Sequence, residues 1–186
     1  MPSDASPSKD HRPSAVRHAS RAVPSHYGSP FARKLRTLVF MHRFGFEHDM
    51  YETLEFMPLD IRRRSDMAGV RIALAGWQAL AFAERLTLGQ LSVDTEADLD
   101  AYRLIARAMM NRVEQPMKEE HRATPWRDAG VTTRIAARAR ELGFAFEPAG
   151  WGALSDSAKY ALYRLADSKK DPSKLEAALA ELLPTA

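Results

Sequence analysis

A near-repetition within the chain limits its possible folds more than any other feature of the sequence. The stretch GVRIALAGWQAL, from Gly69 to Leu80, matches GFAFEPAGWGAL, from Gly143 to Leu154, at a constant offset of 74 residues. Extended outward, the match gives about ten identities over about 34 positions, which is the signature of an internal repeat. We therefore interpret the sequence as an internal duplication.

Each copy predicts the same order of elements. The first begins with a helix in PLDIRRRSDMAG, where Pro58 suits the first helical position and Gly69 can adopt the left-handed conformation that ends a helix. The alternating VRIAL beyond it indicates a short extended segment, as does FAFEP in the second copy. A turn containing Trp and a further helix follow each segment. The sequence thus predicts a mostly α-helical domain, in which VRIAL and FAFEP are the two candidates for short β segments.

Another helix is predicted after each copy. The segment DTEADLDAYRLIARAMMNRV has acids in its first turn, where they complement the helix dipole, and apolar residues at intervals of three and four. The segment DPSKLEAALAELL is built in the same way, with Asp171 as N-cap and Pro172 at the first helical position. Between the copies, EQPMKEEHRATPWRDAG is polar and contains prolines, and we interpret it as a linker.

The N-terminal region differs in composition from the rest. Residues 1–32 are rich in Ser, Pro and basic residues and carry few large apolar side chains, so we expect a disordered basic tail. Residues 33–186 are predicted to form a single helical domain with two related halves, about 50–114 and 128–184. The chain has a formal net charge of +3, but its excess of basic residues lies before residue 44, which leaves the predicted domain mildly acidic.

Composition excludes several classes of function. The chain contains no cysteine, which removes disulfides, clusters held by thiolates and cysteine nucleophiles. Its nine glycines are scattered singly, so there is no phosphate-binding glycine loop. No apolar run is long enough to cross a membrane, and the N-terminus lacks the apolar core of a secretory signal. We expect a cytoplasmic protein with no membrane partner.

Several residues admit both a structural and a functional interpretation. The acids beside His48 in FEHDM match no metal-ligand spacing, so we interpret them as part of a solvated turn and predict no metal site. Three consecutive arginines begin at Arg62, and because adjacent helical positions point in different directions we interpret them as a solvated face. Arg62 can still pair with a nearby acid: Glu47, Asp49 or Asp66.

The aromatic residues of the repeat are interpreted as core. Trp77 and Trp151 each follow a Gly and precede a Leu by three positions within the repeated phrase, which favours an anchor of each half-core over a platform for ligand stacking. Tyr160 and Tyr163 share a predicted helix, and the sequence leaves open whether they pack on the core or form an exposed patch.

The segment FGFEHDMYETLEFMPLDIRRRSDMAGVRIALAGWQALAFAERLTL carries a combined pattern of aromatic, acidic and basic positions: Phe44, Phe46, Glu47, Asp49, Pro58, Ile61, Arg62, Arg64, Asp66, Gly69, Trp77, Glu84 and Arg85. This pattern resembles the nitrate reductase associated protein family. The later segment FAFEPAGWGALSDSAKYALYRLA is similar to the family's second block, and the resemblance covers about residues 44–183. Met50, where the family has an aromatic residue, and Ser65, where it has an apolar one, depart from the pattern.

The resemblance implies a helper that an assimilatory, molybdenum-dependent nitrate reductase needs to become or remain active. It implies no catalytic residues, so we expect a non-catalytic accessory protein without a cofactor, whose partner is nitrate reductase or its maturation intermediates. Because positions that differ between the copies are where function can be added, the candidate partner-binding residues are charged residues of the first block: Glu47, Asp49, Arg62, Asp66, Glu84 and Arg85.

Two other classes of function remain open. A small enzyme would use Glu47, Asp49 and Arg62 as acid/base and anion-binding groups, which requires a pocket with shifted carboxylate pKa values. A nucleic-acid-binding regulator is favoured only by the basic tail and the arginine run, while the mildly acidic body argues against a nucleic-acid partner.

Overall fold

The computed structural model describes residues 41–128, 130–168 and 172–183. All described residues belong to one compact unit of the chain. The predicted tail and the predicted N-cap Asp171 lie outside the described residues. The described part is mostly helical and contains one two-stranded antiparallel sheet, which confirms the predicted fold class.

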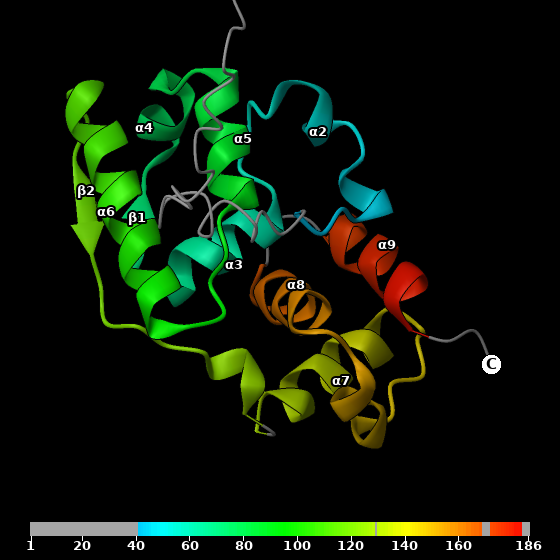
Figure 1. Cartoon of the computed structure of the whole chain (residues 1–186). Helices are drawn as coiled ribbons and strands as arrows, with labels where there is room; N and C mark the ends of the chain where they lie inside the picture. Colours follow the sequence, from blue (N-terminus) through cyan, green and yellow to red (C-terminus); the bar gives the residue numbers. More distant parts are fainter. Residues whose placement is uncertain (1–40, 129, 169–171, 184–186) are drawn as a thin grey trace, which may run out of the picture. The chain divides into compact units, whose positions relative to one another are not determined.

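The order of the elements agrees in part with that expected from the repeat (Figure 1). The elements up to the end of the first half are η1 (Gly45–Glu47), α2 (Met50–Thr53), α3 (Leu59–Met67), β1 (Val70–Ile72), α4 (Leu74–Ala79), α5 (Phe82–Gln90) and α6 (Glu96–Arg112). Those that follow are β2 (Met117–Glu119), η2 (Pro125–Arg127), α7 (Val131–Glu141), η3 (Pro148–Ala153), α8 (Asp156–Asp167) and α9 (Pro172–Leu182).

The two copies share backbone details at equivalent positions. Gly69 and Gly143 both have a positive φ, +66° and +81°, and they follow α3 and α7 as predicted. Leu80 and Leu154, which end the two Trp turns, both have φ −72° and ψ 145°, and each donates its N–H to the carbonyl of the preceding Trp. These correspondences agree with an internal duplication, which itself stays a prediction.

The predicted linker between the copies was wrong. Residues Met117–Glu119 form β2, which pairs antiparallel with β1 so that Arg71 lies opposite Lys118. Farther along the same segment, Trp126 of η2 is only 1% exposed. The polar composition of the segment indicated a linker, because it carries no sign of the backbone pairing that β2 makes with β1. FAFEP in the second copy forms no strand in the described structure, so only one of the two predicted β segments is confirmed.

The core consists of two clusters that α8 connects. The first surrounds Trp77, and the second surrounds Trp151, which confirms both tryptophans as core residues. Helix α8 contacts α3, α7 and α9, and Figure 1 shows it between α3 and α7. Its Tyr160 is fully buried in the first cluster, whereas its Leu162 is buried in the second. Tyr160 is therefore a core residue, and Tyr163 is half-buried beside it.

Candidate functional site

Three of the predicted partner-binding residues line one hollow in the surface. Glu47, Asp49 and Arg62 surround a cavity of about 460 Å³. We call it the apolar hollow, because most of the other residues that line it are apolar: Phe46, Met50, Phe56, Met57, Leu59, Leu74 and Leu165, together with Lys174. Phe56 and Leu74 are half exposed, at 52% and 50%. Large apolar side chains gathered at the surface are typical of interaction sites.

Glu47 lies at the bottom of the apolar hollow rather than on the surface. Its side chain accepts hydrogen bonds from the Tyr51 hydroxyl, at 3.1 Å, and from the Leu59 N–H, at 3.1 and 3.2 Å. Burial raises the pKa of Glu47 to about 7, although both hydrogen bonds oppose the increase. Because Leu59 is the first residue of α3, Glu47 holds the start of this helix in place. Asp49, in contrast, is exposed.

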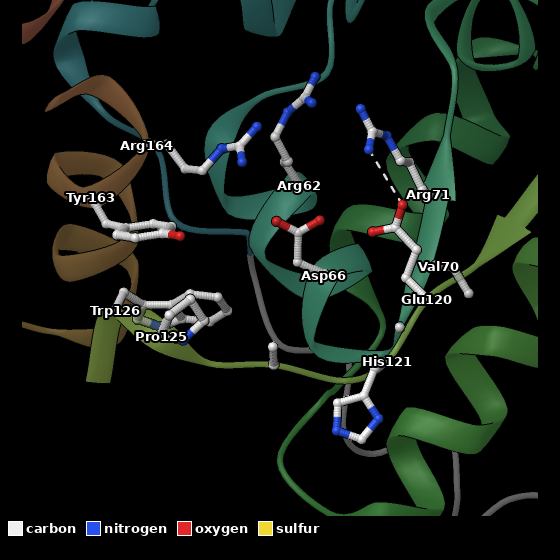
Figure 2. A pocket seen from close by; sticks show the side chains of 12 residues that line it. Arg62, Asp66, Val70, Arg71, Glu120, His121, Pro125, Trp126, Tyr163 and Arg164 are labelled. Atoms are coloured by element: carbon white, nitrogen blue, oxygen red, sulfur yellow. Dashed lines mark hydrogen bonds and ion pairs between the residues drawn. The ribbon is translucent and has the colours of Figure 1, made fainter. Parts of the chain in front are cut away.

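Arg62 also lines a second depression (Figure 2). Arg62 and Asp66 of α3 border this cavity of about 190 Å³. We call it the arginine pocket, and its other charged and aromatic lining includes Arg71, Glu120, Trp126 and Arg164. Arg62 is thus the one predicted residue that borders both the apolar hollow and the arginine pocket.

The acids of the arginine pocket already have partners. The Tyr160 hydroxyl donates to Asp66 at 2.6 Å, and the pKa of Tyr160 is raised above its ordinary value by burial and by the charge of Asp66. Glu120 forms an exposed ion pair with Arg71 at 3.3 Å. The predicted pairing of Arg62 with Glu47, Asp49 or Asp66 does not occur, since no ion pair involves Arg62 in the described part of the chain.

Glu84 and Arg85 line neither depression. Glu84 accepts the N–H of Ala81 at 2.9 Å at the start of α5 and also pairs with Arg112 of α6. Arg85 donates to the carbonyls that surround the end of α4: Leu54, Trp77, Gln78 and Leu80. These contacts give both residues a structural role outside the two depressions.

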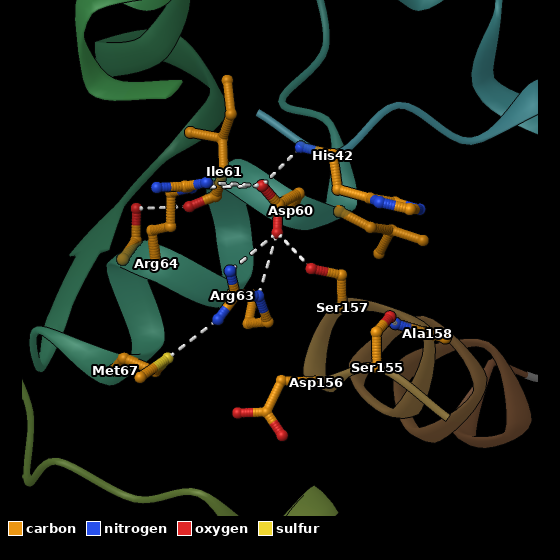
Figure 3. A network of polar contacts seen from close by, with 12 residues as sticks. His42, Asp60, Ile61, Arg63, Arg64, Met67, Ser155, Asp156, Ser157 and Ala158 are labelled. Carbon is orange, nitrogen blue, oxygen red and sulfur yellow. Dashed lines mark hydrogen bonds and ion pairs between the residues drawn. The ribbon is translucent and has the colours of Figure 1, made fainter. Parts of the chain in front are cut away.

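The predicted solvated arginine face was wrong for two of its three members (Figure 3). Arg63 and Arg64 are buried and pair with the fully buried side chain of Asp60, at 2.9 and 3.1 Å. The Ser157 hydroxyl and the His42 N–H also donate to Asp60, at 2.7 and 2.9 Å. Burial alone would raise the pKa of Asp60, but the two guanidinium groups and these hydrogen bonds outweigh it and lower the pKa.

Sequence reasoning missed several residues that line these depressions. Phe56 and Leu74 are not among the residues that the sequence patterns singled out, and only the fold brings them to one surface. Arg71 and Arg164 are far apart in the sequence and line the same pocket because β1 and α8 both border it. Trp126 did carry a usable signal, because a large aromatic residue in an otherwise polar segment is seldom left in water.

The described residues contain no group of three or more His, Asp or Glu side chains that could hold a metal ion. His48, the histidine between the acids of FEHDM, is exposed, and its Nδ1 lies 3.2 Å from the carbonyl oxygen of Gly45. Within the same residues, none of the helices combines the length and the apolar character that crossing a bilayer requires.

The fold and its surface define a mostly α-helical domain with two adjoining depressions that share one arginine. The family model described as conserved nitrate reductase-associated protein matches residues 43–182. The chain therefore belongs to this family, as its sequence pattern predicted. Comparisons with curated proteins and with solved structures found no match.

Proposed function

We propose that this protein is a non-catalytic, cytoplasmic accessory protein that binds assimilatory, molybdenum-dependent nitrate reductase, or an intermediate in its maturation, and supports its activity. The observation that carries the proposal is the family match over residues 43–182, because the family's description names an association with nitrate reductase. The match includes every residue that lines the apolar hollow.

The surface around the apolar hollow supports a protein partner. Protein interfaces combine an apolar centre with a polar rim. Phe56 and Leu74 supply exposed apolar area, while Asp49, Arg62 and Lys174 supply charges of both signs around it. We propose that this face binds the reductase, with Asp49 and Arg62 as the predicted residues that contact it.

The enzyme alternative has one observation in its favour, which is a carboxyl group with a raised pKa that lines a cavity. However, Glu47 is only 4% exposed, and its carboxyl group already accepts hydrogen bonds from Tyr51 and Leu59. A general base must reach the proton that it abstracts. The contacts of Glu47 therefore support a structural role better than a catalytic one.

The nucleic-acid alternative has little support in the described residues. Binding to phosphates requires cations that are free to replace counterions. Most surface arginines instead form ion pairs with acids of the same chain: Arg71, Arg107, Arg112, Arg122, Arg127, Arg134 and Arg138.

Growth on nitrate tests the proposed function. A strain that lacks the gene is expected to grow normally on ammonium and poorly on nitrate, and the wild-type gene should restore growth. Affinity-tagged protein from the complemented strain should retain nitrate reductase during purification. Normal growth of the deletion strain on nitrate, with unchanged nitrate reductase activity in its extract, would contradict the proposal.

The apolar hollow is tested with charged substitutions. Phe56→Glu and Leu74→Glu should each reduce the amount of co-purified reductase at least about tenfold, because a buried charge without a partner opposes docking. Leu104→Glu is the matched control, since Leu104 is 64% exposed on α6 and does not line the hollow. Equal losses in all three variants, or no loss in any of them, would exclude the apolar hollow as the docking surface.

A further inference from the structure

The arginine pocket brings together three guanidinium groups from separate elements. Arg62 comes from α3, Arg71 from β1 and Arg164 from α8, and Figure 2 shows all three along one edge of the pocket. Arg71 shares its charge with Glu120 at 3.3 Å. Arg62 and Arg164 make no ion pair and no side-chain hydrogen bond with any described residue. The donors of these two arginines are therefore available to a ligand.

The charges of the pocket favour a ligand with a single negative charge. Three arginines face two carboxylates, Asp66 and Glu120, which leaves one positive charge when His121 is set aside. A monoanion balances this charge, whereas a dianion would exceed it and would be repelled by both acids. Guanidinium groups also bind flat oxyanions with two parallel hydrogen bonds.

The size and the walls of the pocket favour a small ligand. A volume of about 190 Å³ lies below the range of about 300–1,000 Å³ that is typical of sites for larger organic ligands. Trp126 and Tyr163 form an aromatic wall, with ring centroids 6.2 Å apart. A wall of low polarity beside the arginines strengthens their attraction for an anion, because it reduces screening by water.

We propose that the arginine pocket binds a small, flat, singly charged oxyanion of the nitrate or carboxylate type, held by Arg62 and Arg164. The anion is either free in solution or a carboxylate on the surface of a docked protein, and the chemistry of recognition is the same. The second source rests on the proposed function, whereas the first does not.

The first experiment uses the full chain without any partner. Sodium nitrate and sodium formate are each titrated at constant ionic strength, with sodium chloride as the background salt, while amide and arginine Nε–H resonances are followed by NMR. We expect saturable shifts near the arginine pocket for both anions. The proposal would be overturned if neither nitrate nor formate, or only one of them, gave saturable shifts.

Matched variants locate the site. Combining Arg62→Gln with Arg164→Gln should weaken binding at least about tenfold, since both charge-assisted donors are lost. Arg140→Gln is the control, because Arg140 is an exposed arginine of α7 outside the pocket, and it should bind like the wild type. Equal affinity in the double variant and the wild type would overturn the proposal.

A single substitution covers the case in which the double variant fails to fold. Arg164 is exposed, so Arg164→Gln should keep the melting temperature of the wild type and bind each anion at least about threefold more weakly. Unchanged affinity in this variant would equally overturn the proposal, because Arg164 is one of the two donors that it names.

A second experiment distinguishes the two sources. Binding of purified nitrate reductase is measured with and without saturating formate. Competition would assign the pocket to a carboxylate of the reductase, and simultaneous binding would assign it to a free anion. If the reductase does not bind at all, the proposed docking to the mature enzyme fails, while the anion titration still tests the arginine pocket.

Discussion

Helices α3 and α7 begin the two copies of the repeat, but their polar side chains lie in different environments. Asp60 of α3 is fully buried with two arginines around it. At the position of Asp60, α7 has Arg134, which forms a half-exposed ion pair with Asp167 at 2.9 Å. Helix α3 packs against α5, α6, α8 and β1, whereas the main contacts of α7 are with α8 and η3. A residue that differs between the copies therefore often reports how deeply its helix is buried.

This comparison changes how the differences between the copies are interpreted. We expected these differences to mark added function. Arg62, whose equivalent in the second copy is Ala136, remains such a candidate. The equivalent of Arg85 in the second copy is Lys159. The hydrogen bonds that Arg85 donates to backbone carbonyls give a structural reason for an arginine at this position. Only differences without a structural partner remain as evidence for function.

The two repeat tryptophans provide the largest test of the comparison. Trp77 is fully buried and donates Nε1–H to the carbonyl of Leu54 at 2.7 Å. Trp151 is 5% exposed, and its Nε1 is buried without a partner in the described part of the chain. Both Trp→Ala variants should lose about 3–5 kcal/mol of unfolding free energy in urea titrations, and Trp77→Ala about 1 kcal/mol more than Trp151→Ala. A larger loss for Trp151→Ala would reverse the comparison.

The second test concerns the buried and the exposed ion pairs. Asp60→Asn leaves Arg63 and Arg64 buried without a counter-charge, so we expect the unfolding free energy to fall by about 3–5 kcal/mol. Asp167→Asn, at the half-exposed pair of α7, should cost less than about 1 kcal/mol. Chemical denaturation of both variants measures the difference, and similar values would show that the burial of α3 does not govern its polar contacts.

The third test uses the two glycines with positive φ. A Cβ atom at Gly69 would lie 2.6 Å from the carbonyl oxygen of Glu120, whereas a Cβ at Gly143 would meet no atom within 4 Å. Both Gly→Ala variants incur about 1–2 kcal/mol of left-handed strain. We expect a total loss of about 2–4 kcal/mol of unfolding free energy for Gly69→Ala, because the backbone at Glu120 must also move. Equal melting temperatures for the two variants would count against the close approach of Glu120 to Gly69.

The smallest expected effect is the pH dependence of stability that Glu47, in the first half, gives to the protein. Its pKa is raised from 4.5 to about 7, so the folded protein retains a proton that the unfolded chain has lost between these values. This contribution to stability is complete below about pH 4.5 and is lost as the pH rises through about 7. Between about pH 5 and about pH 6.5, the unfolding free energy of the wild type should fall by about 2 kcal/mol relative to that of Glu47→Gln.

Denaturation at several pH values compares the wild type with Glu47→Gln and with Asp49→Asn. Asp49→Asn removes an exposed carboxylate from the same segment and leaves Glu47 in place, so this variant should keep the pH dependence that Glu47 gives to the wild type. Parallel stability curves for the wild type and Glu47→Gln would show that the Glu47 carboxyl group is not protonated by burial.

Much of the fold could be predicted from local patterns. The helix α6 was predicted from its acidic first turn and apolar spacing, and the burial of Tyr102 follows from that spacing. The stops at Gly69 and Gly143 were also predictable, because few other residues adopt a positive φ. The β1–β2 pair was not, since β2 is three residues of mixed polarity and its partner is distant in the sequence.

The candidate site was less predictable, because depressions form between elements that are far apart in the chain. The charged motif of the first block did include Asp49, Arg62 and Asp66, which line the two depressions. It did not distinguish them from Glu84 and Arg85, whose types suit binding equally well. Their positions separate the two groups, because Glu84 and Arg85 line neither depression, and these positions depend on the tertiary structure.

The contacts between α3 and α8 have a consequence for the newly made chain. Ser157 is 97 residues after Asp60, and Tyr160 is 94 residues after Asp66. At a synthesis rate of about 5–20 residues per second, α3 waits about 5–20 seconds on the ribosome for these two hydroxyl groups. During this interval Asp60 lacks the Ser157 hydroxyl, and the half-core around Trp77 lacks the ring of Tyr160. Most of the chain must therefore be synthesised before the core of the first copy can be completed.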